Sequence, residues 1–360
     1  MQSPRHPGCL PVLIGSLPLE DHREATGLVL SYTPQIPLWV QLPCYAQEGM
    51  MRQFLPGLPG LTVRDDRWFI DSGRDDFDQQ LIDFFEDYMA VSDGAVDILG
   101  VDRFALTEET ARGFFVFLDE IAKLSSAPFA VKGQITGPIT LGTGIRDQDG
   151  RAIFYDTNIR DAMVKHLAMQ AKWQTRRLAQ LGSPVIIFID EPALAGFGSS
   201  ELISITVEEI QAGLAEVIAA IQSEGGLAGV HVCANTDWSL LLKSQVDIVN
   251  FDAFGYFDRF ILYQDALKTF LARGGIIAWG VVPTLNADDI RGVDQETLMA
   301  QWQARLERVT ALGVDRQTVL RQSLITPACG TGSLSRPLAE KVLALTRQVS
   351  ETVRQEVLGK

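Results

Sequence analysis

Residues 184–194 read PVIIFIDEPAL, and an uninterrupted apolar run from Val185 to Ile189 forms the centre of this stretch. A run of that length, rich in β-branched side chains and bounded by prolines, is typical of a strand buried on both faces of a parallel sheet. Residues 206–226, TVEEIQAGLAEVIAAIQSEGG, follow with the apolar spacing of an amphipathic helix and end in two glycines, which favour a helix C-terminus. The stretch therefore predicts one strand followed by one helix.

The same alternation recurs along the chain. Apolar runs followed by amphipathic stretches occur at residues 128–141, 227–236, 246–254, 276–284 and 322–330. Two earlier apolar runs, at residues 10–18 and 36–43, supply candidates for the first two strands. Eight strand–helix units predict an α/β fold, a (β/α)8 TIM barrel that occupies residues 1–360 as a single domain. A doubly wound open sheet is the alternative, but no Gly-x-Gly-x-x-Gly follows the first strand.

One N-terminal segment does not follow the alternation. Residues 60–80 read GLTVRDDRWFIDSGRDDFDQQ. This pattern predicts a hairpin inserted into the barrel before a helix. No internal repeat, low-complexity tract or linker in the sequence indicates a second domain.

Composition and charge exclude several classes of partner. The formal net charge of −14 argues against a nucleic-acid surface, which needs clustered Lys and Arg. No run approaches the roughly 18 apolar residues that a membrane helix needs, so we expect no membrane partner. The first residues lack the apolar core of a signal peptide. The four cysteines are too few and too scattered for a disulfide framework, which indicates a reducing, cytoplasmic location.

Polar residues occur where the predicted strands end. In a TIM barrel, functional side chains gather at the C-terminal ends of the strands. The residues that fall at these ends are Ser16, Lys132, Asp190, Glu191, His231, Cys233, Asp252 and Cys329. Their distribution predicts one site at the mouth of the barrel.

His231 and Cys233 are two positions apart on a predicted strand, so their side chains share a face. An imidazole and a thiolate at this spacing can bind tetrahedral Zn²⁺ if other strands supply further ligands. Cys329, at the end of the last strand, is the natural third ligand, and Asp252 could add a carboxylate oxygen. Two structural alternatives stay open: His231 and Cys233 as a satisfied buried pair, and Asp252 as a helix N-cap or loop carboxylate.

Asp190 and Glu191 are adjacent on one predicted strand, so their side chains point to opposite faces. They are therefore not expected to form a close carboxylate pair. We expect one of them to bind a cationic group of a substrate and the other to form a salt bridge or a cap. Two solvated loop acids are the alternative.

Five motifs together resemble the catalytic, C-terminal barrel of cobalamin-independent methionine synthase, in its short core form. They are IGSLP at 14–18, KGQITGPITL at 132–141, IDEPAL at 189–194, HVC at 231–233 and ACG at 328–330. They occur in the family's order and at similar spacing, and the resemblance covers nearly the whole chain. More broadly, the chain resembles the superfamily that includes uroporphyrinogen decarboxylase and the corrinoid-dependent thiol methyltransferases.

The resemblance implies an enzyme that activates homocysteine as a zinc thiolate and methylates it to methionine. The zinc ligands that it implies are His231, Cys233, Cys329 and, by position, Asp252, where the family carries Glu. The homocysteine-binding residues that it implies are the Asp of IDEPAL, Asp190, and the Ser of the IGS loop, Ser16. With their neighbours, the candidate substrate-binding residues are Ile14, Gly15, Ser16, Asp190 and Glu191.

Two departures from the family bear on the methyl donor. The chain leaves no room for the additional N-terminal barrel that helps to bind folate, and residues 279–289, WGVVPTLNADD, contain no His where the family carries one. A folate nitrogen leaves only with a proton, whereas a methylated corrinoid leaves as Co(I) without one. We therefore expect methylcobalamin, or a methyl-corrinoid protein as partner, to supply the methyl group.

Four alternatives stay open. They are a folate-dependent methionine synthase, a methyl-corrinoid transferase that acts on another thiol such as coenzyme M, a uroporphyrinogen decarboxylase-like enzyme, and a non-catalytic binding protein. A decarboxylase of that kind would need Arg residues near the N-terminus to hold substrate carboxylates, and the segment IPLWVQLPCYAQEGMMRQF lacks an Arg-rich pattern.

Overall fold

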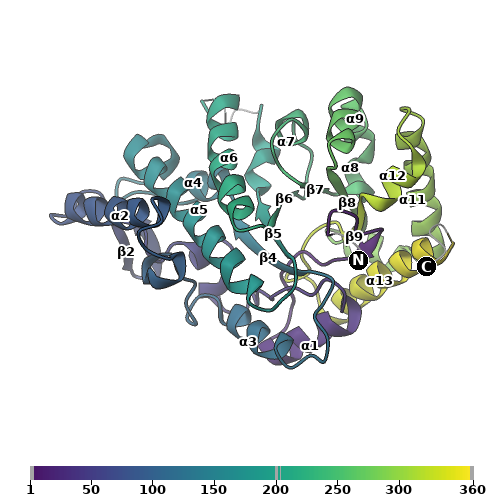
Figure 1. The fold of residues 1–360 in the computed structure, drawn as a ribbon, viewed down its shortest axis with the longest axis horizontal. Coiled ribbons are helices and arrows are strands. Elements are labelled where there is room, and N and C mark those ends of the chain that lie inside the picture. The colour runs from purple at the N-terminus through teal and green to yellow at the C-terminus, as the bar shows by residue number, and fades with distance from the viewer. Residues whose placement is uncertain (1–3, 199–201, 203, 357–360) are drawn as a thin grey trace.

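The computed structural model describes residues 4–198, 202 and 204–356, and these residues form an α/β fold around a curled parallel sheet (Figure 1). The sheet has seven strands in the order β1-β9-β8-β7-β6-β5-β4. The strands are β1 (Leu10–Pro11), β4 (Val131–Thr136), β5 (Val185–Asp190), β6 (Leu227–Val232), β7 (Ile248–Phe251), β8 (Ile276–Val282) and β9 (Ser323–Pro327). From β4 to β9, each strand pairs in parallel with the next one along the chain. The six strands predicted after residue 127 are thereby confirmed.

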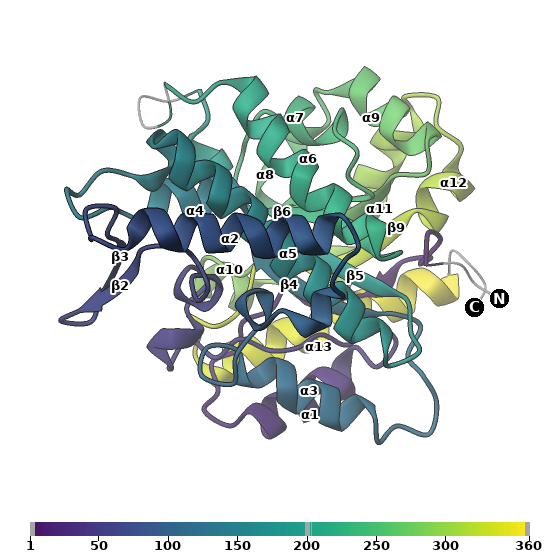
Figure 2. The same ribbon diagram turned by 60° about the vertical axis from the view of Figure 1, so that its left-hand side comes forward.

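Helices connect these strands and cover the outside of the sheet (Figures 1 and 2). They are α1 (His22–Tyr32), α2 (Phe77–Ser92), α3 (Arg112–Ile121), α4 (Pro138–Gly144), α5 (Thr157–Ala179), α6 (Val207–Ser223), α7 (Ser239–Leu242), α8 (Ala253–Phe260), α9 (Gln264–Ala272), α10 (Ala287–Gly292), α11 (Gln295–Thr310), α12 (Arg316–Arg321) and α13 (Arg336–Glu356). Helix α6 begins with a capping box between Thr206 and Glu209 and is followed by Gly225 at φ +76°. The local sequence thus sets both ends of this helix.

The ring of strands is not closed, which corrects the prediction of a complete eight-stranded barrel. Residues 36–42 occupy the gap between β1 and β4, but they make only isolated parallel bridges, Leu38 to Lys132 and Gln41 to Ser16. Pro37, at the position where the ladder to β4 would continue, has no N–H to donate. Residues 10–18, predicted as the first strand, contain only the two-residue β1. The sheet is therefore a curled seven-stranded sheet with an irregular eighth segment.

Alternation along the strands separates two apolar layers. In β5, Ile186 and Phe188 belong to a cluster that fills the inside of the curled sheet, whereas Ile187 and Ile189 belong to the larger cluster that includes the surrounding helices. This period of two explains why the strand at residues 185–189 reads as continuously apolar, since both of its faces are buried. The inner cluster fills the space inside the curled sheet, so the polar side chains at the strand ends lie above it.

The N-terminal hairpin is confirmed. Strand β2 (Leu61–Arg64) pairs antiparallel with β3 (Arg67–Ile70), and the turn residues Asp65 and Asp66 have φ of +50° and +60°. Two consecutive positive φ angles are the mark of a tight hairpin turn that matches the strand twist. The hairpin leads into the long helix α2, which lies across α5 in Figure 2.

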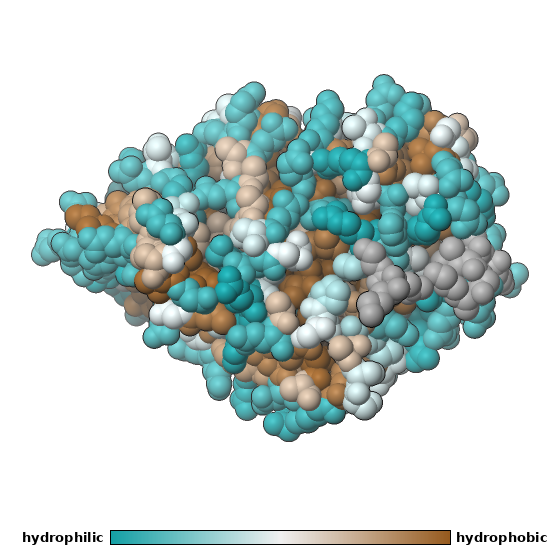
Figure 3. Space-filling model, viewed as in Figure 1, coloured by the Kyte–Doolittle hydropathy of each residue, from teal (hydrophilic) through white to brown (hydrophobic). Residues whose placement is uncertain are grey.

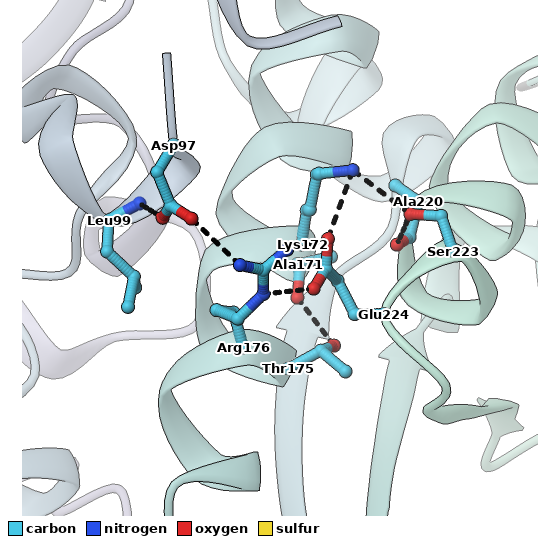
Figure 4. A network of polar contacts seen from close by, with 9 residues as sticks. All are labelled: Asp97, Leu99, Ala171, Lys172, Thr175, Arg176, Ala220, Ser223 and Glu224. Atoms are coloured by element: carbon cyan, nitrogen blue, oxygen red, sulfur yellow. Dashed lines mark hydrogen bonds and ion pairs between the residues drawn. The ribbon is translucent and has the colours of Figure 1, made fainter. Parts of the chain in front are cut away.

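An ion-pair network connects the N-terminal excursion, residues 60–104, to the helices that cover the sheet (Figure 4). Asp97, at the start of a 3₁₀ turn (Ile98–Gly100), accepts a hydrogen bond from Arg176 Nη1 at 2.8 Å. Arg176 on α5 also donates to Glu224 Oε1 at 3.0 Å, and Lys172 Nζ lies 3.1 Å from the same carboxylate. The network joins the excursion to α5 and to the residue that follows α6.

The surface is predominantly polar on the face shown in Figure 3, where hydrophobic residues gather near the centre between hydrophilic helices. Two large apolar side chains of α2, Ile82 and Met89, are about half exposed. Among the helices in the described part of the chain, none combines the length and the apolar composition needed to cross a membrane.

The packing of α3 against the irregular eighth segment gives a first test. A β-carbon added at Gly113 on α3 would lie 2.0 Å from the Val40 carbonyl oxygen, whereas one added at Gly27 on α1 meets nothing within 4 Å. We expect Gly113→Ala to lower the free energy of unfolding by about 1–3 kcal/mol because helix and segment must separate. Gly27→Ala should leave it unchanged or raise it by up to about 1 kcal/mol. Urea unfolding measures both, and equal effects would contradict the close approach.

Candidate metal centre and binding cavity

The C-terminal ends of β5, β6 and β7 bring three polar side chains into adjacent positions. The parallel register pairs Asp190 with His231, and His231 with Asn250. All three side chains are buried. They come from strand positions that face the inside of the curled sheet, above the inner apolar cluster.

His231, Cys233 and Cys329 form one group. A ring nitrogen of His231 and the two sulfur atoms all lie within 4.8 Å of one another. Cys233 is the first residue after β6, and Cys329 is the second residue after β9. The structure therefore brings together three of the four side chains that the sequence predicted as metal ligands.

The chemistry of this group fits a metal ion. His231 Nδ1 is hydrogen-bonded to Asn250 Oδ1, while Nε2 is buried and has no hydrogen-bond partner among the described residues. A hydrogen bond with Cys329 and the neighbouring imidazole of His231 lower the pKa of the Cys233 thiol to about 4. One imidazole nitrogen and two sulfur ligands are a donor set that suits Zn²⁺. The group can thus hold a metal ion and would leave one position of a tetrahedral shell open.

Asp252 is not brought into this group. Its carboxylate Oδ1 accepts a hydrogen bond from Gly255 N at 2.8 Å and so caps the N-terminus of α8. Burial raises the pKa of this carboxyl. The geometry matches the N-cap alternative for Asp252 rather than the predicted role as fourth ligand.

Asp190 and Glu191 have different surroundings, as expected for adjacent residues at the end of one strand. Asp190 lines a cavity beside the metal group, and its Oδ1 is buried without a hydrogen-bond partner among the described residues. Burial raises its pKa to about 6, and the nearby His231 and Lys132 oppose that rise. An unpaired carboxylate in this setting is suited to bind a cationic group.

Glu191, one of the predicted substrate-binding residues, is not part of the cavity lining. It is fully buried, and its carboxylate accepts hydrogen bonds from Ile139 N, Thr140 N and the Thr140 hydroxyl at 2.7–2.9 Å. These donors lie at the start of α4, where the helix dipole favours a negative charge. Glu191 therefore holds α4 against the end of β5.

The cavity has a volume of about 410 Å³ and opens onto the metal group. Its lining includes Ile14, Ser16, Asp190, His231, Cys233 and Cys329. Gly15 lies just behind the wall, where an added β-carbon would be 3.0 Å from Gln41 Oε1. Of the predicted substrate-binding residues, the structure thus places three in the cavity wall, one behind it and one, Glu191, away from it.

The loop after β9 is fitted closely to Ser16. Gly332 N donates to Ser16 Oγ at 3.2 Å, and Thr331 N donates to Ser16 O at 3.0 Å. A β-carbon at Gly330 would lie 2.3 Å from Ser16 Oγ. The glycine that follows Cys329 therefore permits the contact between the first and last segments of the sheet.

Sequence reasoning missed one wall of the cavity. Gln41 lines it from the irregular eighth segment, and Glu48 and Met50 line it from the residues that follow this segment. The buried Glu48 carboxylate is hydrogen-bonded to His22 Nε2 at 2.6 Å and to Leu42 N at 3.0 Å. This wall lies in loops and 3₁₀ turns, including Ala46–Glu48 and Arg52–Phe54, whose sequence has no periodic pattern to mark it.

Lys132 was predicted at a strand end, but it is the second residue of β4 and is fully buried below the cavity. Its Nζ donates to Ile14 O at 2.5 Å and lies 4.5 Å from the centre of the Phe188 ring. Burial lowers its pKa to about 8. Lys132 thus supports the Ile14 backbone from beneath rather than facing a ligand.

The chain was also compared with known proteins. No protein-family model matches it, and no curated protein does.

Zinc binding tests the composition of the metal group. We expect the purified protein to retain about one zinc ion per chain. Cys233→Ala and Cys329→Ala should each lose most of the zinc, because the methyl group of alanine cannot replace a sulfur ligand. Cys44→Ala is the matched control, because Cys44 is exposed and lies outside the group. Inductively coupled plasma mass spectrometry after dialysis gives the stoichiometry. Asp252→Asn should keep its zinc, and loss of zinc from that variant would place the carboxylate among the ligands.

Substitution of Glu191 and of Asp190 should change the free energy of unfolding in different ways. Glu191→Ala leaves three buried donors without an acceptor and should lower the free energy of unfolding by about 2–4 kcal/mol. Asp190→Asn removes a carboxylate with no partner and should leave the free energy of unfolding unchanged or raise it at pH 7. Urea unfolding of both variants measures these effects.

The pH dependence of the free energy of unfolding tests the raised pKa of Asp190. Its pKa is about 6 in the folded chain against an ordinary 3.8, so the folded state holds the proton over this window. The stability due to this group is present below pH 3.8 and falls as the pH rises toward 6. Relative to Asp190→Asn, the parent should lose stability over this range, and a parallel course of the two curves would contradict the assignment.

Proposed function

We propose that the chain is a zinc-dependent methyltransferase that methylates the thiol of homocysteine to give methionine. The observation that carries this proposal is the His231–Cys233–Cys329 group, which opens into a cavity that also holds the unpaired carboxylate of Asp190. The resemblance to methionine synthase implies a strand at residues 36–42, which lie between β1 and β4 and form only isolated bridges.

Each residue of this site has a separate proposed role. His231, Cys233 and Cys329 would hold the zinc ion, which when bound stabilises a substrate thiol as the thiolate at neutral pH. Asp190 would bind the ammonium group of the amino acid through the carboxylate oxygen that lacks a partner. Ser16, held by the loop after β9, lies in the same wall. The thiolate sulfur would then form a bond to the methyl carbon of the donor in an in-line displacement, while the bond from that carbon to the donor atom breaks and its electron pair leaves with the donor.

The charge of the cavity favours homocysteine over coenzyme M. The acidic side chains in its lining are Asp190 and Glu48, and the described lining residues include no Lys or Arg. A sulfonate would need a cation, whereas an ammonium group needs an anion. The same absence of cations in the described lining disfavours a substrate with several carboxylates, such as a uroporphyrinogen.

The donor that the site favours is methylcobalamin or a methyl-corrinoid protein. The one histidine in the described cavity lining is His231, which is committed to the metal group, and both oxygens of Glu48 are hydrogen-bonded. Since Asp190 is assigned to the substrate ammonium group and the two cysteines to the metal, the described lining leaves no separate proton donor for a folate nitrogen. A Co(I) corrinoid leaves without a proton, so a corrinoid donor needs no acid in the cavity.

The decisive assay supplies the zinc-loaded protein with homocysteine and one donor at a time. We expect methionine from methylcobalamin, little or none from methyltetrahydrofolate, and no product with coenzyme M as acceptor. Asp190→Asn should raise KM for homocysteine by about 10-fold or more, because a charge-assisted contact of about 1.5–3 kcal/mol is lost. Cys329→Ala should abolish turnover. Methionine formed from the folate donor alone would refute the donor assignment, and a fully folded protein that binds no zinc would refute the function.

A further inference from the structure

Asn250 is a fully buried amide at the centre of the strand ends. It lies on β7, and its Nδ2 donates to Ala278 O on β8 at 2.9 Å and to Thr326 Oγ1 on β9 at 2.9 Å. Its Oδ1 faces His231 Nδ1 on β6. One side chain therefore connects four neighbouring strands directly beneath the metal group.

The surroundings of this amide decide which way it points. The Ala278 carbonyl oxygen can only accept a hydrogen bond, so the atom of Asn250 that faces it must be the NH2 group. The amide oxygen is consequently directed at His231. Because that oxygen can only accept, His231 Nδ1 must carry the hydrogen of the bond between them.

We propose that Asn250 is a positioning residue, which holds His231 in the Nδ1–H tautomer and directs the Nε2 lone pair at the metal. The inference deepens the proposed function and rests on its metal group. His231 Nε2 is buried, and no nitrogen or oxygen atom of the described residues accepts or donates a hydrogen bond there, as this role requires. A second hydrogen bond that orients a ligating histidine is a recurrent feature of metal sites.

An amide gives this site a property that a carboxylate would not. Asn250 has no proton to lose or gain in the ordinary pH range, so its hydrogen bond adds no charge to a group that already contains two sulfur ligands. The bond to Thr326 also ties the amide to the strand that ends just before Cys329. The imidazole and the last strand are therefore aligned before any metal arrives, and His231 needs no change of tautomer on binding.

Nitrogen NMR of the metal-free protein tests the tautomer directly. In a ¹⁵N-labelled sample kept alkaline enough for the ring to be neutral, with His231 assigned by its absence from the His231→Gln spectrum, we expect the proton on Nδ1 and a lone pair on Nε2. Asn250→Leu, which has a similar volume and no acceptor, should lose this preference. Asn250→Asp, which keeps an acceptor oxygen, should retain it. An Nε2–H tautomer in the parent would overturn the inference, even if Asn250→Leu failed to fold.

Zinc affinity, measured by competition with a chromophoric chelator, gives the second readout. We expect a decrease of about 10- to 100-fold for Asn250→Leu and a smaller decrease for Asn250→Asp. Gln174→Leu is the control, because Gln174 is another fully buried amide, which bonds Trp39 and Gln134 outside the metal group. It should bind zinc like the parent. Equal affinities of Asn250→Leu and the parent would overturn the inference.

These measurements need neither homocysteine nor a methyl donor. If the tautomer and the affinities follow the expectation but no methyl transfer is found, the inference stands and the proposed function fails. If methyl transfer is found but the parent carries Nε2–H, the function stands and the inference fails.

Discussion

Parallel pairing of β4 to β9 in chain order is the constraint on which the rest of the structure depends. It brings the carboxyl ends of consecutive strands to one edge, so Asp190, His231 and Asn250 become lateral neighbours although they are far apart in the sequence. Cys329 joins them because β9 lies on the other side of β8 in the same curled sheet. The inner apolar cluster fills the space beneath, so these polar groups face the cavity above it.

The polar groups near the cavity fall into two kinds. Glu191, Glu48 and Lys132 are buried and have their hydrogen bonds satisfied, and each of them fastens a segment of backbone. Asp190 Oδ1 and His231 Nε2 are buried with no hydrogen-bond partner among the described residues. A buried polar atom without a partner costs about 1–3 kcal/mol. The strands on either side hold these two atoms in place despite that cost, as expected of groups kept for a ligand.

Much of this arrangement could be predicted from the sequence, because strand ends are marked locally. The apolar run before Asp190 and the two-residue spacing of His231 and Cys233 located the site and its facing side chains. The opposite roles of Asp190 and Glu191 followed from alternation along a strand. The wall around Glu48 could not be predicted, since it depends on how an irregular segment folds back over the sheet.

Other misses have equally specific causes. Residues 36–42 form isolated bridges in place of the predicted strand. Pro37 has no N–H for the ladder, and an apolar pattern does not show which backbone donors a ladder would need. Asp252 follows a strand end as Cys233 does, but its carboxylate caps the helix that begins at the next residue. Asn250 could be placed on the same face as Asp252, yet its contacts with Ala278 and Thr326 arise only from the sheet register.

The central claim is that this group binds a metal that in turn binds the substrate thiol. X-ray absorption at the zinc edge, recorded with and without selenohomocysteine, tests it most directly. We expect two sulfur ligands at about 2.3 Å and an imidazole nitrogen in the resting protein, with a zinc–selenium distance appearing when the substrate analogue is added. A zinc shell without sulfur, or one that selenohomocysteine leaves unchanged, would contradict it.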